Sequence, residues 1–514
     1  MGVSGEKTAR TSERAAIDWP VFVGSVALLV SLVTPLALFP EGGKVLLSQA
    51  FDYVTQNFGV VYIMAGIFSL GFLLFLAWGR HGNIVFAREP NAVPQFSTFS
   101  WSSMLFCGGI GTSVLYWGSV EWAHYYVSPP FDIVGQTAEA LPWAVSYPLF
   151  HWGLIGWAFY CLPGIAMGYA YYIRGATSLR LSEACATVIL PGLRKYLDPV
   201  IDLIFVVGLV GACSTGIGLA VPLIGALVCD LLGLDREALG FTLDVVVIVT
   251  ITILFAASAW LGLEKGIKRL SNINILLAFL LIIFVLLVGP TLFIVELGLE
   301  SVGVLLQNFV RMSTWTDPLG SSNFVESWTV FYWAWWLALG PFMGVFIAKI
   351  SRGRTMRQII VGCLGFGTLG CTAFFVVLGN YTAYLELNNI VDVVGMINAG
   401  HAPEAIVSVL RTLPGSTFVV LLFMVVCVIF AATSYDSASY TLATAATKNL
   451  PEDEHPGRSH RIFWAFLLGL LPITLVAMGG LRPLQSAVTL ASVPLLIVLC
   501  LMSWGLWRGL TNHE

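Results

Sequence analysis

Long apolar runs constrain this chain more than any other feature of its sequence. Hydrophobic residues make up 57% of the 514 positions and charged residues only 11%, a balance that soluble globular domains do not show. About 20 consecutive apolar residues are enough for a helix to cross a bilayer. Twelve such runs are present, at 20–38, 59–79, 99–119, 143–173, 199–232, 240–262, 270–295, 325–348, 358–380, 416–443, 461–480 and 485–507. The sequence therefore predicts an all-α integral membrane protein with twelve transmembrane helices.

Basic residues in the connecting loops predict the orientation of these helices, because cytoplasmic loops carry an excess of Lys and Arg. With the N-terminus inside, 20 of the 25 basic residues fall on the cytoplasmic side. The exceptions are Lys44, Arg236, Arg311, Arg411 and Arg482. We expect the first helix to be retained, since polar residues lead it and no small-residue cleavage pattern follows. We therefore predict a multi-pass plasma-membrane protein with both termini in the cytoplasm.

Several classes of function are disfavoured by the composition and the motifs. Nine cysteines are scattered singly through the apolar runs, without CxxC spacing, so we expect neither disulfides nor metal clusters. A net charge of −4 without runs of like charge argues against a nucleic-acid partner. The spacings HExxH, GxSxG and paired histidine do not occur, which argues against an intramembrane enzyme. We therefore expect no enzyme activity and no cofactor. Membrane lipids are expected to surround the chain.

Aromatic residues crowd the segment 328–355, WTVFYWAWWLALGPFMGVFIAKISRGRT. Tryptophan in a membrane helix is usually an interface anchor. Trp336, however, precedes Lys349 by thirteen residues, roughly 19 Å along a helix, which places its ring near mid-bilayer. We expect it to line a cavity, or else to pack between helices, together with Trp333 and Trp335. The pair Gly340-Pro341 is expected to interrupt the helix just beyond them.

The run at 143–173 predicts a second set of deep aromatic rings. Trp152 lies nine residues beyond Trp143, roughly 14 Å into the membrane by helical rise. Trp157 and Tyr160 follow within a broad arc of the same helix, and we expect all three to meet Trp336 across a cavity. Such rings suit a quaternary ammonium group, which has no N–H to donate and is held by the negative faces of aromatic rings.

Two isolated ionisable residues near these rings allow two interpretations each. His151 is either a hydrogen-bonded packing residue or a proton carrier. Glu121, at the outer end of the run that precedes it, is either a solvated carboxylate or part of an access path.

Small and polar residues mark two further places inside spanning runs. Gly108, Gly109 and Gly111 serve either close helix packing or a locally unwound backbone, whose carbonyls meet a cation and whose amides meet an anion. In the run at 416–443, Thr433 and Ser434 stand beside other polar groups, which at such depth face a cavity or the bundle interior. Hydroxyl and carbonyl oxygens suit a hard alkali cation, although hydrogen bonds between helices are the alternative.

These motifs resemble the betaine/choline/carnitine transporter (BCCT) family from about residue 99 to 450. The aromatic segment WTVFYWAWW…GPF…ISRGRT, the glycine-rich third run and TSYDS at 433–437 occur in the order found in the family. The resemblance implies a five-plus-five inverted-repeat (LeuT-like) fold, a homotrimer and a bacterial inner membrane. The parts would be 1–98 with two peripheral helices, 99–295 as the first repeat, 296–324 as an amphipathic external connector and 325–514 as the second repeat.

By position, the resemblance implies which residues hold the substrate. The aromatic cage would consist of Trp152, Trp157, Tyr160 and Trp336, with Trp335 and the backbone of Gly108, Gly109 and Gly111 beside it. Leu339 stands where family members often carry a further aromatic residue, which leaves the geometry of the cage open.

The resemblance also bears on coupling. VLYWGSVE and LFHWG resemble the sodium-independent carnitine/γ-butyrobetaine antiporters, but Asn274 stands where that branch carries an arginine. In the sodium-coupled branch, a hydroxyl pair like Thr433 and Ser434 joins carbonyls that correspond to those near Cys107 and Ile110. We therefore expect sodium symport of a small quaternary ammonium substrate of the betaine, carnitine or choline type, with sodium-independent exchange of carnitine-like betaines as the alternative. A passive channel is disfavoured, since an aromatic trap at mid-depth slows conduction.

Overall fold

Helices make up almost all of the described structure. The computed structural model describes residues 16–89, 92–108, 111–261, 264–320, 322–448 and 455–512, with the side chains of 255, 258, 259, 261 and 264–269 left out. Within this part, one antiparallel pair of two-residue strands joins β1 (Ala16–Ile17) to β2 (Thr447–Lys448).

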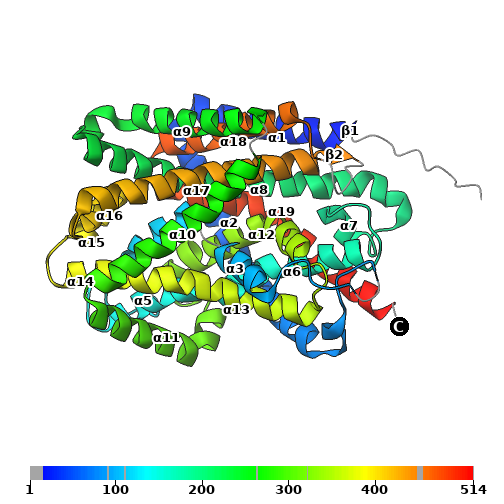
Figure 1. Cartoon of the computed structure of the whole chain (residues 1–514), viewed down its shortest axis with the longest axis horizontal. Coiled ribbons are helices and arrows are strands. Elements are labelled where there is room, and N and C mark those ends of the chain that lie inside the picture. The colour runs from blue at the N-terminus through cyan, green and yellow to red at the C-terminus, as the bar shows by residue number, and fades with distance from the viewer. Residues whose placement is uncertain are drawn as a thin grey trace, which may run out of the picture.

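The helices can be followed in chain order in Figure 1. They are α1 (Trp19–Leu38), α2 (Pro40–Trp78), η1 (Arg80–Asn83), α3 (Thr98–Gly108), α4 (Thr112–Val127), α5 (Ala140–His151), α6 (Leu154–Tyr172), α7 (Leu181–Cys185), α8 (Pro191–Leu232), α9 (Arg236–Leu261), α10 (Glu264–Val288), α11 (Thr291–Thr314), η2 (Val325–Val330), α12 (Phe331–Ile350), α13 (Met356–Phe374), η3 (Phe375–Gly379), α14 (Asn380–Leu387), α15 (Val393–Asn398), α16 (Ala402–Arg411), α17 (Ser416–Ala445), α18 (Arg458–Met478) and α19 (Leu481–Thr511).

The expected number of membrane-spanning segments is confirmed, but their identities differ at one place. In the described residues, 12 helical segments are long and apolar enough to cross a membrane. The predicted run 99–119 is not one of them, because it is divided into α3 and α4, with extended backbone at Gly111 (φ −155°, ψ −172°). Gly109 and Ile110 lie outside the described residues. The twelfth candidate by length and hydropathy is α11. It overlaps the region 296–324, whose place as an amphipathic external connector stays a prediction.

The helix predicted at 59–79 is longer in the structure, because the prediction stopped at polar residues. The helix α2 begins at Pro40, 19 residues before the apolar run at 59–79. Asp52 lies in this extra part and forms an ion pair with Arg482 of α19. Charged and polar residues such as Asp52 end the apolar run. The helix continues through them, because the Asp52 carboxylate is paired with Arg482.

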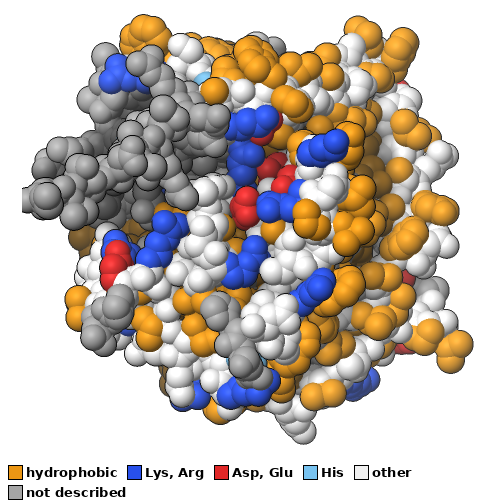
Figure 2. All heavy atoms as spheres, turned by 90° about the vertical axis from the view of Figure 1, so that its right-hand side faces the viewer, with side chains coloured by type: hydrophobic (Ala, Val, Ile, Leu, Met, Phe, Trp, Pro, Cys, Tyr) orange, Lys and Arg blue, Asp and Glu red, His pale blue; other side chains and the backbone are white. Residues whose placement is uncertain are grey.

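Both ends of the described chain lie at the same end of the molecule. Figure 1 places β1 and the C-terminus toward the right, whereas α11 and α14 to α16 lie toward the left. Viewed from the right-hand end, Lys and Arg side chains gather on the surface (Figure 2). The end of the molecule that carries both termini is therefore also an end that carries many Lys and Arg side chains.

Glycines bring α6 and α12 close together at the centre of the bundle. A Cβ at Gly164 would lie 3.0 Å from Ile347, and one at Gly340 would lie 2.6 Å from the carbonyl oxygen of Phe159, so both positions need a residue without a side chain. The predicted interruption at Gly340-Pro341 is wrong, since α12 continues through both residues. The role of Gly340 is close packing.

Candidate functional site

A cavity of about 690 Å³ opens where the divided helix α3–α4 meets α6, α8, α10, α12 and α17. This volume is typical of a small-molecule site. Its aromatic and apolar lining includes Trp152, Tyr160, Trp335, Trp336, Leu339, Phe342, Met343 and Phe346, and its polar lining includes Ser113, Thr433, Ser434, Asp436, Ser437 and Thr441. Residues from both predicted repeats therefore face one space.

Most of the predicted substrate residues line this cavity. Trp152, Tyr160, Trp335, Trp336, Leu339, Gly108 and Gly111 all do so. The ring of Trp336 stands at the centre of the group, with its centroid 4.4 Å from that of Tyr160 and 5.6 Å from that of Trp152. Trp152 lies nearly edge-on to Trp336, with 73° between the ring planes. We call Trp152, Tyr160, Trp335 and Trp336 the aromatic cage.

Trp157 lies behind the aromatic cage and does not line the cavity. It is fully buried, with its ring centroid 5.6 Å from that of Tyr160 and 5.9 Å from that of Trp336. A Cβ at Gly367 would lie 2.2 Å from the indole, so α13 presses Trp157 against the other two rings. Trp333, for which we left two possibilities, packs between helices against Phe150.

Each indole N–H of the aromatic cage donates a hydrogen bond to a buried acceptor. Trp336 donates to the carbonyl oxygen of His151 (3.0 Å), Trp335 to that of Ala212 (3.1 Å), and Trp152 to the carboxylate of Glu121 (2.9 Å). These bonds fix the planes of the three indole rings at the cavity.

Glu121 and His151 are buried together beside the aromatic cage. Both side chains are fully buried, so the interpretation of Glu121 as a solvated carboxylate is wrong. Both ring nitrogens of His151 have partners, with Nδ1 2.9 Å from the Tyr125 hydroxyl and Nε2 3.1 Å from that of Thr329. This agrees with the hydrogen-bonded packing role that we considered for His151.

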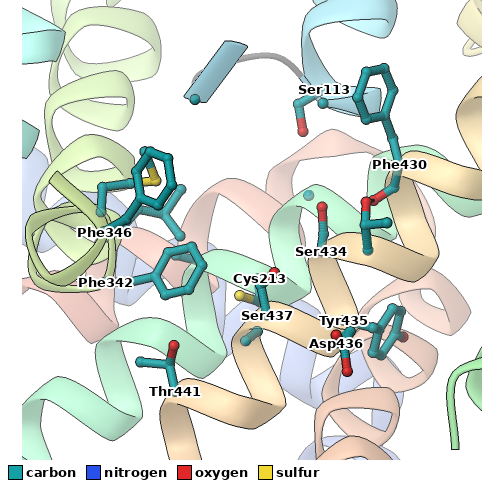
Figure 3. Close-up of a pocket in the computed structure, with 18 of the residues that line it drawn as sticks. Ser113, Cys213, Phe342, Phe346, Phe430, Ser434, Tyr435, Asp436, Ser437 and Thr441 are labelled. Atoms are coloured by element: carbon teal, nitrogen blue, oxygen red, sulfur yellow. Dashed lines mark hydrogen bonds between the residues drawn. The ribbon is translucent and has the colours of Figure 1, made fainter. Parts of the chain in front are cut away.

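Hydroxyl groups form a further part of the cavity wall. Figure 3 shows the hydroxyls of Ser113 and Ser434 pointing toward one another, with Phe342 and Phe346 across the space from them. The predicted sodium ligands Cys107, Thr433 and Ser434 all line the cavity, and the fourth, Ile110, lies outside the described residues. Thr112 donates from its hydroxyl to the carbonyl oxygen of Cys427 (3.1 Å) and so ties α4 to α17. The cavity is therefore lined by hydroxyl oxygens as well as by aromatic rings.

Charged residues also line the cavity. Lys349, Asp436 and Arg461 line it, and Arg461 donates to the Asp436 carboxylate at 3.0 Å. Lys349 ends α12 and Arg461 lies near the start of α18. Asp436 of α17 thus binds a side chain from the next helix, α18.

Sequence reasoning missed some of the lining residues. Phe346 follows Phe342 by four positions, one helical turn, and this spacing was a signal for a second aromatic ring on the cavity face of α12. Cys213 and Ser271 offered no comparable signal, because small residues occur throughout the apolar runs. Asn274 does not line the cavity but donates to the carbonyl oxygen of Val426 (3.1 Å).

Comparison with known proteins identifies the family. The family model for BCCT, the betaine/carnitine/choline family transporter, matches residues 20–514. The chain belongs to this family. Two relatives match along most of their length. An uncharacterized transporter of Escherichia coli strain K12, YeaV, is 34% identical over 447 residues, which cover 86% of this chain and 91% of the relative. A carnitine transporter of Acinetobacter baumannii is 30% identical over 489 residues, 95% of this chain and 88% of the relative.

Membership of the BCCT family confirms the broad predictions. The chain is a multi-pass membrane transporter of the betaine, carnitine or choline type, and not an enzyme. Its helical architecture with 12 candidate spans is consistent with the LeuT-like fold of the family. The boundaries of the two repeats and the roles of the individual cavity residues stay predictions.

Proposed function

We propose that this BCCT transporter couples the uptake of a quaternary ammonium substrate to sodium by alternating access. The observation that carries the proposal is a cavity of about 690 Å³ that is lined both by the four rings of the aromatic cage and by several hydroxyl groups. Both termini are proposed to be cytoplasmic, and the working unit to be a homotrimer in the bacterial inner membrane.

The aromatic cage supplies the binding chemistry for the ammonium group. A trimethylammonium group carries a full positive charge but no hydrogen-bond donor, so ring faces are the ligands that remain. Cation–π contacts are worth about 2 kcal/mol or more when they are desolvated. The rings of Trp152, Tyr160 and Trp336 are buried to more than nine-tenths, which meets this condition.

The hydroxyl wall supplies the ligands that we propose for sodium. Thr433 donates its hydroxyl hydrogen to the carbonyl oxygen of Ile429 (2.9 Å), which leaves the oxygen lone pairs available to a cation. Ser434 and Cys107 face the same cavity, so the ion would join α3 to α17. A sodium ion that enters along the membrane potential contributes about 2.3 kcal/mol per 100 mV, to which its concentration gradient adds.

Uptake into proteoliposomes tests the coupling. An inward sodium gradient is expected to drive accumulation of radiolabelled glycine betaine, carnitine or choline several-fold above equilibration, because the ion and the substrate bind together. The control replaces sodium with potassium at the same imposed membrane potential. Uptake that is indifferent to sodium, together with rapid counterflow from preloaded vesicles, would instead support the sodium-independent exchanger.

The double variant Thr433→Ala/Ser434→Ala tests the ion site. It is expected to raise the sodium concentration for half-maximal uptake about tenfold, since a lost bond to a charged partner costs about 1.5 to 3 kcal/mol. Thr444→Ala is the matched control, because this hydroxyl also donates within α17, to Tyr440 at 2.9 Å, but does not line the cavity. The same sodium dependence in the double variant and the control would remove the pair from the ion site.

A further inference from the structure

A buried carboxylate stands directly behind the aromatic cage. Glu121 of α4 is 0% exposed, and its two oxygens receive three hydrogen bonds. Tyr332 (2.6 Å) and Trp152 (2.9 Å) donate to Oε2, and Tyr125 donates to Oε1 (2.7 Å). An anionic carboxylate can accept all three of these hydrogen bonds.

The neighbouring histidine can make all of its contacts in its neutral form. His151 Nδ1 lies 3.6 Å from Oε1 of Glu121. Because Tyr125 uses its hydrogen toward Glu121, its oxygen can only accept from Nδ1–H, and Nε2 is then free to accept the hydroxyl hydrogen of Thr329. This assignment leaves the imidazole neutral. Among the described residues, no Lys or Arg side chain forms an ion pair with Glu121. A buried charge without a counter-charge is costly, so the position calls for a cation.

The cavity beside Glu121 is where that cation would be found. Trp152 both donates to the carboxylate and lines the cavity. Tyr332, the second donor to the same oxygen, stacks against Trp335 of the aromatic cage, with 6.3 Å between ring centroids. Trp336 is attached to the same cluster through the carbonyl oxygen of His151. Three rings of the aromatic cage therefore contact the carboxylate or its immediate neighbours.

We propose that Glu121 provides the counter-charge for the quaternary ammonium group of the substrate, so that the aromatic cage prefers a cation to a neutral group of the same shape. This role for Glu121 rests on the proposed function. It assigns part of substrate recognition to a residue that need not touch the substrate. Glu121 acts in two ways. It orients Trp152 through the indole N–H, and its charge makes the indole face and the adjoining cavity more negative. It is thus a positioning and specificity residue.

Two ligands of the same shape, one with a charged nitrogen and one with a carbon atom in its place, distinguish this electrostatic role of Glu121 from a purely structural role. Choline and 3,3-dimethyl-1-butanol share one shape, as do glycine betaine and 3,3-dimethylbutyrate, with a carbon atom in place of the charged nitrogen. Binding to the full-length protein in detergent is measured by calorimetry for both members of each pair. Wild-type protein that binds none of the cations would contradict the proposed function itself, independently of Glu121.

Glu121→Gln is expected to weaken choline binding about tenfold, the size of a Coulomb attraction across roughly 10 Å at an intermediate dielectric. Binding of the uncharged 3,3-dimethyl-1-butanol is expected to change by less than about twofold. Glycine betaine and 3,3-dimethylbutyrate both carry a carboxylate, so for this pair the ratio of the two affinities is expected to fall by the same factor. Tyr332→Phe is the matched control. It removes one hydrogen bond to the same oxygen but keeps the charge, so it is expected to change both ligands by the same factor. An equal loss for both ligands in Glu121→Gln would overturn the proposal and assign Glu121 to packing alone.

Two further variants keep the test decisive if the glutamine protein does not fold. Glu121→Met also removes the charge and is expected to show the same selective loss, whereas Glu121→Asp keeps the charge and is expected to retain the preference for the cation. If both neutral variants fail to fold and Glu121→Asp folds, the empty protein itself needs the charge, and the proposal is overturned.

Discussion

Trp336→Leu is expected to weaken binding of a quaternary ammonium substrate by about thirtyfold or more. Trp336 is the central ring of the aromatic cage, 4.4 Å from Tyr160 and 5.6 Å from Trp152 between centroids. Leucine keeps an apolar side chain but removes the ring face, and a desolvated cation–π contact is worth about 2 kcal/mol or more, where 1.4 kcal/mol is a factor of ten in affinity. The dissociation constant is measured by calorimetry or by equilibrium binding of radiolabelled substrate.

Trp464→Leu is the matched control for this substitution. Trp464 of α18 is also fully buried, and its indole N–H donates to the Nε2 atom of His460 at 2.9 Å, but it does not line the cavity. Both variants lose packing, so both are expected to melt at a lower temperature. Only Trp336→Leu is expected to lose affinity. If the two variants bind equally well, Trp336 is a packing residue and the aromatic cage does not hold the ammonium group.

Helical rise predicts a depth for Trp152 and Trp336 from the sequence alone, because it converts a count of positions into a distance along the membrane normal. This argument placed Trp152 and Trp336 away from the interface, and both line the cavity. Depth does not tell which side of a helix faces the cavity. Trp157 was predicted to meet Trp336 across the cavity, but it packs against α13 and lies behind the other rings.

The environment of Glu121 could not be predicted from the local sequence. Its donors Trp152 and Tyr332 lie 31 and 211 positions further along the chain, so its burial depends on how α4, α5 and α12 meet. Near the end of an apolar run, a carboxylate that faces water and a carboxylate that accepts three hydrogen bonds can have the same neighbours in the sequence. The sequence around Glu121 therefore does not distinguish the two. The same holds for Gly340-Pro341, a pair that usually interrupts a helix. Here the approach of α6 gives the glycine a packing role within a continuous α12.

Contacts between α6 and α12 also predict that Gly156 cannot be replaced by alanine without disturbing the aromatic cage. Gly156 lies near the start of α6, and a Cβ at this position would lie 2.5 Å from Cε2 and 2.8 Å from Nε1 of Trp336. The indole cannot move away freely, because its N–H is bonded to the carbonyl oxygen of His151 and Tyr160 lies against its ring. The absence of a side chain at Gly156 therefore decides where the central ring of the aromatic cage stands.

Gly156→Ala is accordingly expected to lower the free energy of unfolding by about 1 to 3 kcal/mol, the usual cost of overpacking, and to reduce substrate affinity at least tenfold as Trp336 is displaced. Gly365→Ala in α13 is the control, because a Cβ there meets nothing within 4 Å. In that variant the better helix propensity of alanine is expected to raise stability slightly without any effect on binding. Thermal unfolding and binding are measured for both proteins. Normal affinity in Gly156→Ala would show that the position of Trp336 does not control recognition, since the added methyl group must shift this ring before any other part of the cavity.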